Sequence, residues 1–179
     1  MTVVDVQRGL PTEVADPKTL RRAFGAFGTG VTVVTVGGAH PHGMTANSFT
    51  TVSLDPPLVL VCVERTAIMH SCLVEEGRFG ISVLGTQQES VARHFADRRR
   101  PLGRAQFDVV DWRPGALTDA PLILGALAHF ECEVWRAYDG GDHTIFLGLL
   151  LSLDRRAADD ALLFFQGRFR QFGQDAEMT

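Results

Sequence analysis

The run VTVVTVGG, residues 31–38, is the part of the sequence that decides the fold class. Its first six residues are all β-branched and two glycines end the run, which predicts a strand. The run LVLVCV, residues 58–63, is continuously apolar and predicts a second strand that is buried on both faces. The sequence LDPP, residues 54–57, precedes that run and is typical of a turn. These runs predict that the first half of the chain is rich in β-structure.

Further strand and helix patterns surround the two runs. Strands are expected at residues 79–84, as a pair over 126–138, at 143–154 and at 162–165, with a turn at 139–142. A first helix is expected to begin at Asp16-Pro17 and to be ended by Gly28 and Gly30. Two more helices are expected, over 66–76, ended by Gly77, and over 87–96. Six or seven strands with a few short helices predict a mainly β (α+β) fold, a β-barrel with peripheral helices. The sequence lacks the regular β–α alternation and glycine-rich turn of a Rossmann sheet.

The composition is that of an ordinary globular protein. The chain has 179 residues, of which 45% are hydrophobic and 21% charged, which suits one domain with a sizeable core and excludes a disordered chain. The net charge of −4 argues against a nucleic-acid binder and against docking on an anionic membrane. No apolar run reaches the length of about 18 residues that predicts a transmembrane helix, and residues 1–16 lack the apolar core of a signal peptide.

The cysteines and the chain ends complete this general description. Residues 1–16 are polar and aperiodic and are expected to form a flexible arm, residues 17–173 the single domain, and residues 174–179 a tail. Cys62, Cys72 and Cys132 are an odd number and have no CxxC spacing. We therefore expect free thiols, no disulfide framework and no metal site, in a cytoplasmic protein.

Polar side chains cluster in the stretch from Gly43 to Pro57. Thr45, Asn47 and Ser48 place two hydroxyl groups and an amide beside an apolar strand. A carboxamide offers both a donor and an acceptor, which suits the edge of a heteroaromatic ring. The same residues also fit a polar strand edge whose hydroxyl groups cap turns, and spacing alone leaves both interpretations open.

Two more features are candidates for ligand contact. Asp142-His143 follows a Gly-Gly pair, where the histidine either holds the turn or meets a ligand. Residues 98–100 are three consecutive arginines, followed by Arg104. This basic cluster fits either a solvated loop or a mobile lid that attracts phosphate groups.

Four segments, in order along the chain, resemble the flavin reductase family, the short-chain NAD(P)H:flavin oxidoreductases that serve two-component monooxygenases. The segments are LRRAF with GTGVTVVT (20–24 and 28–35), residues 43–57, GRFGISVL (77–84), and GDHT (141–144) with Gly148. The resemblance covers about residues 17–172. It implies a split β-barrel of the FMN-binding type, a homodimer, a flavin that is FMN or FAD, and NADH or NADPH as the reductant.

The resemblance also implies site residues, carried over position by position. The strand against the isoalloxazine ring matches Pro41, His42, Gly43, Met44, Thr45, Asn47 and Ser48, and the end of the next strand, beside the ring and ribityl chain, matches Cys62, Val63 and Glu64. The phosphate turn matches Arg65, Thr66, Ile68 and Met69, a helix position near the flavin matches His94 and Phe95, and the nicotinamide segment matches Asp142, His143 and Thr144. His143 is the expected catalytic residue.

This chain departs from the family in the phosphate turn. The family usually has Ser or Arg there, whereas residues 66–69 read TAIM. Phosphate contact is therefore expected from Arg65, Thr66 or backbone N–H groups at a helix start. For His94, a position on the helix surface beside a core Phe95 is an equal alternative.

The reaction that the resemblance implies is hydride transfer from nicotinamide to flavin N5, after which reduced flavin diffuses to a partner monooxygenase. The two cofactors carry out this chemistry, so no protein nucleophile, redox-active cysteine or metal is expected. The alternative is a non-catalytic flavin- or haem-binding split barrel that acts as a carrier or sensor. Asp142-His143 favours the reductase, because a pure flavin binder needs no nicotinamide site.

Overall fold

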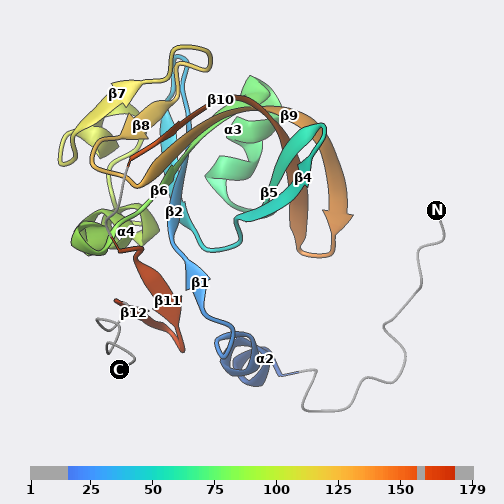
Figure 1. The fold of residues 1–179 in the computed structure, drawn as a ribbon. Helices are drawn as coiled ribbons and strands as arrows, with labels where there is room; N and C mark the ends of the chain where they lie inside the picture. Colours follow the sequence, from blue (N-terminus) through green and yellow to red (C-terminus); the bar gives the residue numbers. More distant parts are fainter. Residues whose placement is uncertain (1–15, 157–159, 172–179) are drawn as a thin grey trace, which may run out of the picture.

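The computed structural model describes residues 16–156 and 160–171 (Figure 1). Its main element is an antiparallel sheet of seven strands in the order β3-β2-β6-β9-β10-β5-β4. These strands are β2 (Thr32–Val36), β3 (His42–Ala46), β4 (Thr50–Leu54), β5 (Pro57–Glu64), β6 (Arg78–Val83), β9 (Ala128–Gly140) and β10 (His143–Arg155). The prediction of a mainly β fold is confirmed.

Shorter elements surround this sheet. β1 (Thr29–Gly30), β11 (Leu163–Phe165) and β12 (Arg168–Arg170) form a three-stranded sheet, and β7 (Trp112–Pro114) pairs with β8 (Pro121–Ile123). The α-helices are α2 (Pro17–Phe24), α3 (Ile68–Glu76) and α4 (Glu89–Ala96), and short 3-10 helices span Thr86–Gln88 and Gly103–Phe107. Within the described ranges, no helix is long and apolar enough to cross a membrane.

The seven-stranded sheet is strongly curled. β3 and β4 are its two edges, yet only residues 47–49 connect them. Such a short connection spans at most about 14 Å, so the two edges must approach each other. Helix α3 lies within the curl and contacts β2, β3, β5 and β6 (Figure 1). This arrangement is the split-barrel type that the resemblance implied.

The split lies between β3 and the second half of β5. β4 pairs with β5 only from Pro57 to Leu60. Residues 61–64 of β5 therefore extend beyond the end of β4, on the side where β3 approaches. The split is bounded by these two strands, and this is where the site described below is found.

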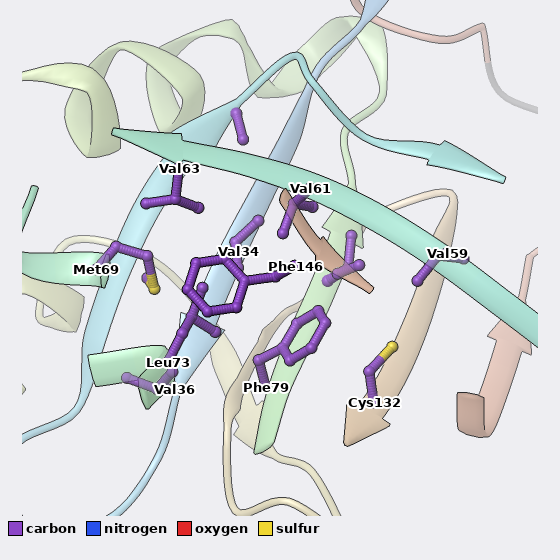
Figure 2. Packing of buried hydrophobic residues seen from close by; sticks show 12 residues of the cluster. Val34, Val36, Val59, Val61, Val63, Met69, Leu73, Phe79, Cys132 and Phe146 are labelled. Carbon is purple, nitrogen blue, oxygen red and sulfur yellow. The ribbon is translucent and has the colours of Figure 1, made fainter. Parts of the chain in front are cut away.

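The first hydrophobic core fills the curl (Figure 2). Val34 of β2, Val61 of β5, Phe79 of β6 and Phe146 of β10 are buried, and they pack against Met69 of α3. Burial of these side chains removes a large apolar surface from water and stabilises the curl around α3. The N-terminal end of α3 is thereby fixed against the split.

A second core cluster fixes α4 against β3. Phe95 of α4 is buried together with Val33 and Phe107. Gly43 of β3 lies directly against the Phe95 ring, because a Cβ atom added at Gly43 would lie 2.6 Å from Cε1 of Phe95. Glycine is required for this close approach, which brings the C-terminal end of α4 to the split.

Several element boundaries differ from the sequence predictions. Helix α2 ends at Phe24, capped by Gly25, earlier than expected. The strand pair expected over 126–138 is instead the single strand β9, whose pairing with β10 contains two irregularities. Gly77, with a φ of 63°, ends α3 as predicted. The expected tail, 174–179, and all but Asp16 of the expected arm, 1–16, lie outside the described residues.

Candidate functional site

A cavity of about 450 Å³ lies at the split. Its volume is in the range usual for small-molecule sites. β3 and the residues after it line one side, the end of β5 lines the other, and α3 and α4 contribute their N-terminal and C-terminal ends. The lining residues are His42, Met44, Thr45, Ala46, Asn47, Ser48, Cys62, Glu64, Thr66, Ala67, Ile68, Met69, Phe95, Ala96, Arg98, Arg100, Leu102 and His143.

The hydroxyl groups of Thr45 and Ser48 bond neighbouring elements of the cavity wall to one another. Ser48 Oγ accepts a hydrogen bond from the N–H of Cys62 and donates one to its C=O, both at 3.0 Å. Thr45 Oγ1 donates to the C=O of Ala92 on α4 at 2.7 Å. The Asn47 side chain is exposed, lines the cavity, and makes no hydrogen bond with any residue that the structure describes. Its carboxamide is therefore available to a ligand.

One end of the cavity suits an anion. Ala67 is the N-cap of α3 and offers no side-chain acceptor to the first N–H groups of the helix, and Ala67 and Ile68 both line the cavity. Uncapped N–H groups and the helix dipole attract negative charge. Arg98 lines the same cavity, where its Nη2 donates to Glu64 Oε2 at 2.9 Å. Guanidinium and helix N–H groups together provide phosphate donors.

His42 and Arg100 form a polar pair in the cavity wall. Arg100 Nη2 lies 3.3 Å from His42 Nε2 and also donates to the C=O of Gly43. Burial, and then the charge of Arg100, lower the pKa of His42 to about 4. His42 is therefore neutral near pH 7, and its Nε2 accepts the hydrogen bond from the guanidinium.

Gln106 ties the segment 97–107 to β3. This side chain is fully buried, and its Oε1 accepts a hydrogen bond from the N–H of Gly43 at 2.9 Å. Its Nε2 donates to the C=O groups of Pro41 at 2.9 Å and Gly103 at 2.8 Å. These bonds favour a fixed wall over the mobile lid that the sequence left open. They also engage the Gly43 N–H, so that group is not a donor for a ligand.

His143 lies at the rim of the cavity on the turn between β9 and β10. Its Nδ1 lies 2.7 Å from Asp142 Oδ1, and this bond lowers the pKa of Asp142. Arg65 donates from Nε to the C=O of Gly141 at 3.0 Å and pairs with Asp139 at 3.1 Å. Arg65 therefore positions the turn. When His143 donates from Nδ1 to Asp142, Nε2 of the neutral ring is left as an acceptor for a ligand.

Most of the expected site residues line this cavity. Those that do are His42, Met44, Thr45, Asn47, Ser48, Cys62, Glu64, Thr66, Ile68, Met69, Phe95 and His143. Those that do not are Pro41, Gly43, Val63, Arg65, His94, Asp142 and Thr144. The structure thus gathers residues from four separated segments of the chain at one place.

The expected residues outside the cavity have structural contacts instead. Val63 and Thr144 alternate along their strands with Cys62 and His143 and so face the core. Thr144 Oγ1 lies 2.8 Å from Nε2 of His70. His94 donates from Nε2 to the C=O of Gln106 at 2.7 Å and so supports the wall segment.

Six lining residues were not among the expected site residues: Ala46, Ala67, Ala96, Arg98, Arg100 and Leu102. The alanines carry no functional group, so no residue pattern marks them. Arg98 and Arg100 belong to the basic cluster, but the sequence does not show which arginines face the cavity. Arg99, between them, does not line it and pairs with Asp97.

The cavity has the chemistry of a site for a planar heteroaromatic ligand with an anionic tail. Met44, Ile68 and Leu102 offer apolar surface, and Asn47 offers an amide. Burial raises the pKa of the Cys62 thiol, which leaves it protonated and unreactive. In ranges 16–156 and 160–171, no group of three or more His, Cys, Asp or Glu residues could hold a metal ion.

Comparison with known proteins agrees with this geometry. The family described as "Flavin reductase like domain" matches residues 24–173. The chain is 58% identical over 170 residues to the NADH-dependent FAD reductase of Streptomyces globisporus. The match covers 93% of this chain and 93% of that protein.

Two solved structures are also similar. The NADH:FAD oxidoreductase of Streptomyces globisporus C-1027, in complex with NAD and FAD fragments, has a TM-score of 0.86 and 56% identity over 91% of this chain and 96% of that one. The flavin reductase component of a bacterial two-component tryptophan halogenase has a TM-score of 0.86 and 57% identity over 89% of this chain and 99% of that one. The family match spans residues 24–173, and each of these relatives is matched over 89% or more of this chain. The chain therefore belongs to the flavin reductase family.

Proposed function

We propose that this protein reduces free flavin with NADH, by hydride transfer from the nicotinamide to flavin N5, in the cavity at the split. The observation that carries the proposal is this cavity, with its apolar walls, amide and cationic end. The chain around it is 58% identical to an NADH-dependent FAD reductase. FMN or FAD is the proposed acceptor, and NADH, rather than NADPH, is the proposed donor.

The flavin and the nicotinamide supply the redox chemistry: a hydride carries two electrons to flavin N5, a proton comes from solvent, and NAD⁺ and reduced flavin are the products. The protein has to hold the two rings face to face and keep water away from them. Asn47 bonds the polar edge of the flavin ring, and Met44, Ile68 and Leu102 exclude water from its apolar part.

The charged ends of the ligands have separate partners in this proposal. Arg98 and the first N–H groups of α3 bind the flavin phosphate. His143, on a different segment, bonds or stacks on the nicotinamide side and is the proposed catalytic residue. The bond to Asp142 holds its ring in one orientation.

The product is proposed to leave and serve a second enzyme. A solved relative is the flavin reductase component of a two-component halogenase, and another relative is the reductase subunit of a flavin-dependent monooxygenase from Rhodococcus jostii, 33% identical. By analogy, reduced flavin from this protein diffuses to an oxygenase. A cytoplasmic location fits this role, since NADH is the donor and the three cysteines are free.

A homodimer is part of the proposal. On β10, Ile145, Leu147 and Leu149 are half-buried and alternate with buried residues that face the core. Ile145 pairs with Cys62, and Leu147 pairs with Leu60 of β5, which is half-buried too. This apolar face adjoins the cavity through Cys62. A second copy on it would cover the face and enclose the rim of the cavity.

The proposal is tested by the loss of NADH absorbance in the presence of FMN, FAD or no flavin. We expect rapid NADH oxidation that requires added flavin. NADPH in parallel reactions is expected to be a poorer donor. Absence of NADH oxidation with either flavin would reject the proposed function.

A further inference from the structure

A second cavity, of about 610 Å³, lies on the other side of the C-terminal end of α4. It is formed by α4, the residues after it, and the β11–β12 hairpin. The lining residues are Arg93, Ala96, Asp97, Arg99, Phe164, Gly167, Arg168 and Phe169. The site described above uses only one of these residues, Ala96.

The lining is positively charged although the protein as a whole is negative. Three arginines and a single acidic residue, Asp97, line it, in a chain of net charge −4, and Arg93 also pairs with Glu89 of α4 at 2.6 Å. Arg99 binds the Asp97 carboxylate, with Nε and Nη2 at 3.0 and 3.1 Å. Arg168 forms no ion pair with the residues that the structure describes. An anion of more than one charge would be attracted to this place.

The cavity also contains an aromatic surface. Phe164 and Phe169 pack edge to face with ring centroids 5.4 Å apart, and both are half-buried. The Arg93 guanidinium lies 4.9 Å from the centroid of the Phe169 ring. Aromatic rings and guanidinium planes are the surfaces on which purine bases stack.

The two cavities are neighbours. Ala96 lines both of them. The three consecutive arginines after α4 are shared between them, since Arg98 and Arg100 line the first cavity and Arg99 lines the second. A ligand with a ring and phosphate in the first cavity could therefore continue past Ala96, with further phosphate beside Arg99.

We propose that the second cavity binds the adenosine diphosphate half of a dinucleotide whose redox-active ring lies in the first cavity. The adenine lies against Phe164 and Phe169, and the phosphate next to the adenosine lies between Arg99 and Arg168, while the other phosphate of the pair stays at Arg98 in the first cavity. FAD and NADH both contain this half, and FMN does not. The proposal rests on the proposed function for its choice of ligand, but the charge and aromatic lining of the cavity stand independently of it.

The first experiment measures binding of ADP alone to the full chain by titration calorimetry. Arg168→Gln removes the charge and keeps most of the side-chain length. Arg170→Gln is the matched control, because Arg170 is exposed, lies two residues along the same strand and does not line the cavity. We expect Arg168→Gln to weaken ADP binding about tenfold, on the order of one charge-assisted hydrogen bond, and Arg170→Gln to leave it unchanged.

A second variant keeps the test valid if Arg168→Gln fails to fold. Arg99 is an exposed side chain on a different segment, so Arg99→Gln should also weaken ADP binding without a change in melting temperature. Failure of wild-type protein to bind ADP, or equal ADP affinity in wild type, Arg168→Gln and Arg99→Gln, would overturn the proposal.

Steady-state kinetics identify which dinucleotide uses the cavity. If it is FAD, Arg168→Gln raises the KM for FAD relative to the KM for FMN. If it is NADH, the variant raises the KM for NADH with either flavin. If Arg168→Gln has the same KM as wild type for FAD, for FMN and for NADH, the proposal is also overturned. If wild type oxidises no NADH while ADP still binds in an Arg168-dependent way, the proposed function fails and the ADP site remains.

Discussion

His42 is a histidine whose protonation state is set by its surroundings. It is 5% exposed and faces the Arg100 guanidinium, so adding a proton would place two positive charges together away from water. Neutral His42 instead accepts a hydrogen bond from Arg100, which also bonds the backbone of β3 at Gly43. The shape of the cavity wall thus depends on an unprotonated imidazole.

This pairing predicts a pH-dependent stability. The folded-state pKa of His42 is about 4, below the usual 6.5. The unfolded chain therefore takes up the proton first as pH falls, and stability is lost between pH 6.5 and about 4. The loss should reach roughly 3 kcal/mol at the lower end. Urea unfolding at neutral and acidic pH measures it.

The control for this prediction is a second histidine close by in the sequence. His42→Gln should flatten the pH dependence, while His40→Gln, at an exposed position, should retain it. An identical pH dependence of wild type and His42→Gln would show that another group is responsible.

His143 is proposed to contact the nicotinamide and not the flavin, so one substitution can distinguish the two binding sites. If it meets the nicotinamide, His143→Ala should raise the KM for NADH about fivefold, the loss of one hydrogen bond, and leave flavin affinity unchanged. Asp142→Asn should have a smaller effect in the same direction, because Asp142 only orients the ring. Steady-state kinetics and melting temperature are measured on the same variants. Wild-type NADH kinetics in a destabilised His143→Ala protein would mean that His143 only holds the turn.

At the scale of elements, the cavity depends on how the segment 97–107 is attached to β3. The buried Gln106 side chain bonds Gly43 of β3, Pro41 just before β3, and Gly103 within the segment itself. The bonded groups are backbone groups of Pro41, Gly43 and Gly103, and without Gln106 they would need other partners. Buried polar groups without partners are costly.

Gln106→Met should therefore lower the free energy of unfolding by about 2 kcal/mol or more and weaken flavin binding. Urea unfolding and quenching of flavin fluorescence measure the two effects. Gln88→Met is the matched control, since Gln88 also bonds backbone groups, at Gly85 and Leu124, but does not line or support the cavity. If both variants lose the same stability and keep wild-type flavin affinity, Gln106 has no special role at the site.

The sequence predicted elements that are determined locally. The β-branched run 31–36, the apolar run 58–63 and the glycine that ends α3 all lie close to where local patterns put them. The residues of β9 predict two strands where there is one, because polar and apolar residues alternate from His129 to Val134 and this alternation ends at Trp135. β7 and β8 have three residues each, too few for a pattern.

For the site residues too, the sequence predicts what depends on the residue itself and not what depends on distant partners. Asn47 and His143 carry chemistry that the sequence alone identifies, and both line the same cavity. Which arginines face the cavity depends on the path of the loop after α4, and the roles of Arg65 and Gln106 depend on partners far away in the chain. Long-range partners leave no local signal.

At the scale of the whole molecule, the sheet leaves an apolar face beside the cavity. Leu60, Ile145 and Leu147 lie next to one another across β5 and β10 and are only half-buried. Leu147→Glu would place a charge at the centre of the proposed homodimer interface. We expect wild type to sediment as a dimer and this variant as a monomer.

Leu153→Glu serves as the control, because Leu153 lies farther along β10 and is 65% exposed. It should remain a dimer. A wild type that sediments as a monomer and is fully active would contradict the homodimer, and a dimeric Leu147→Glu would place the interface elsewhere.

The central claim is that a flavin held at the split is reduced there by NADH. The most direct test mixes the protein–flavin complex with NADH in the absence of oxygen and follows the absorbance of oxidised flavin. The account predicts that this absorbance disappears in a single fast phase, and that His143→Ala needs more NADH to reach the same rate. A flavin that binds but stays oxidised at high NADH would contradict the account and identify the protein as a non-catalytic flavin carrier.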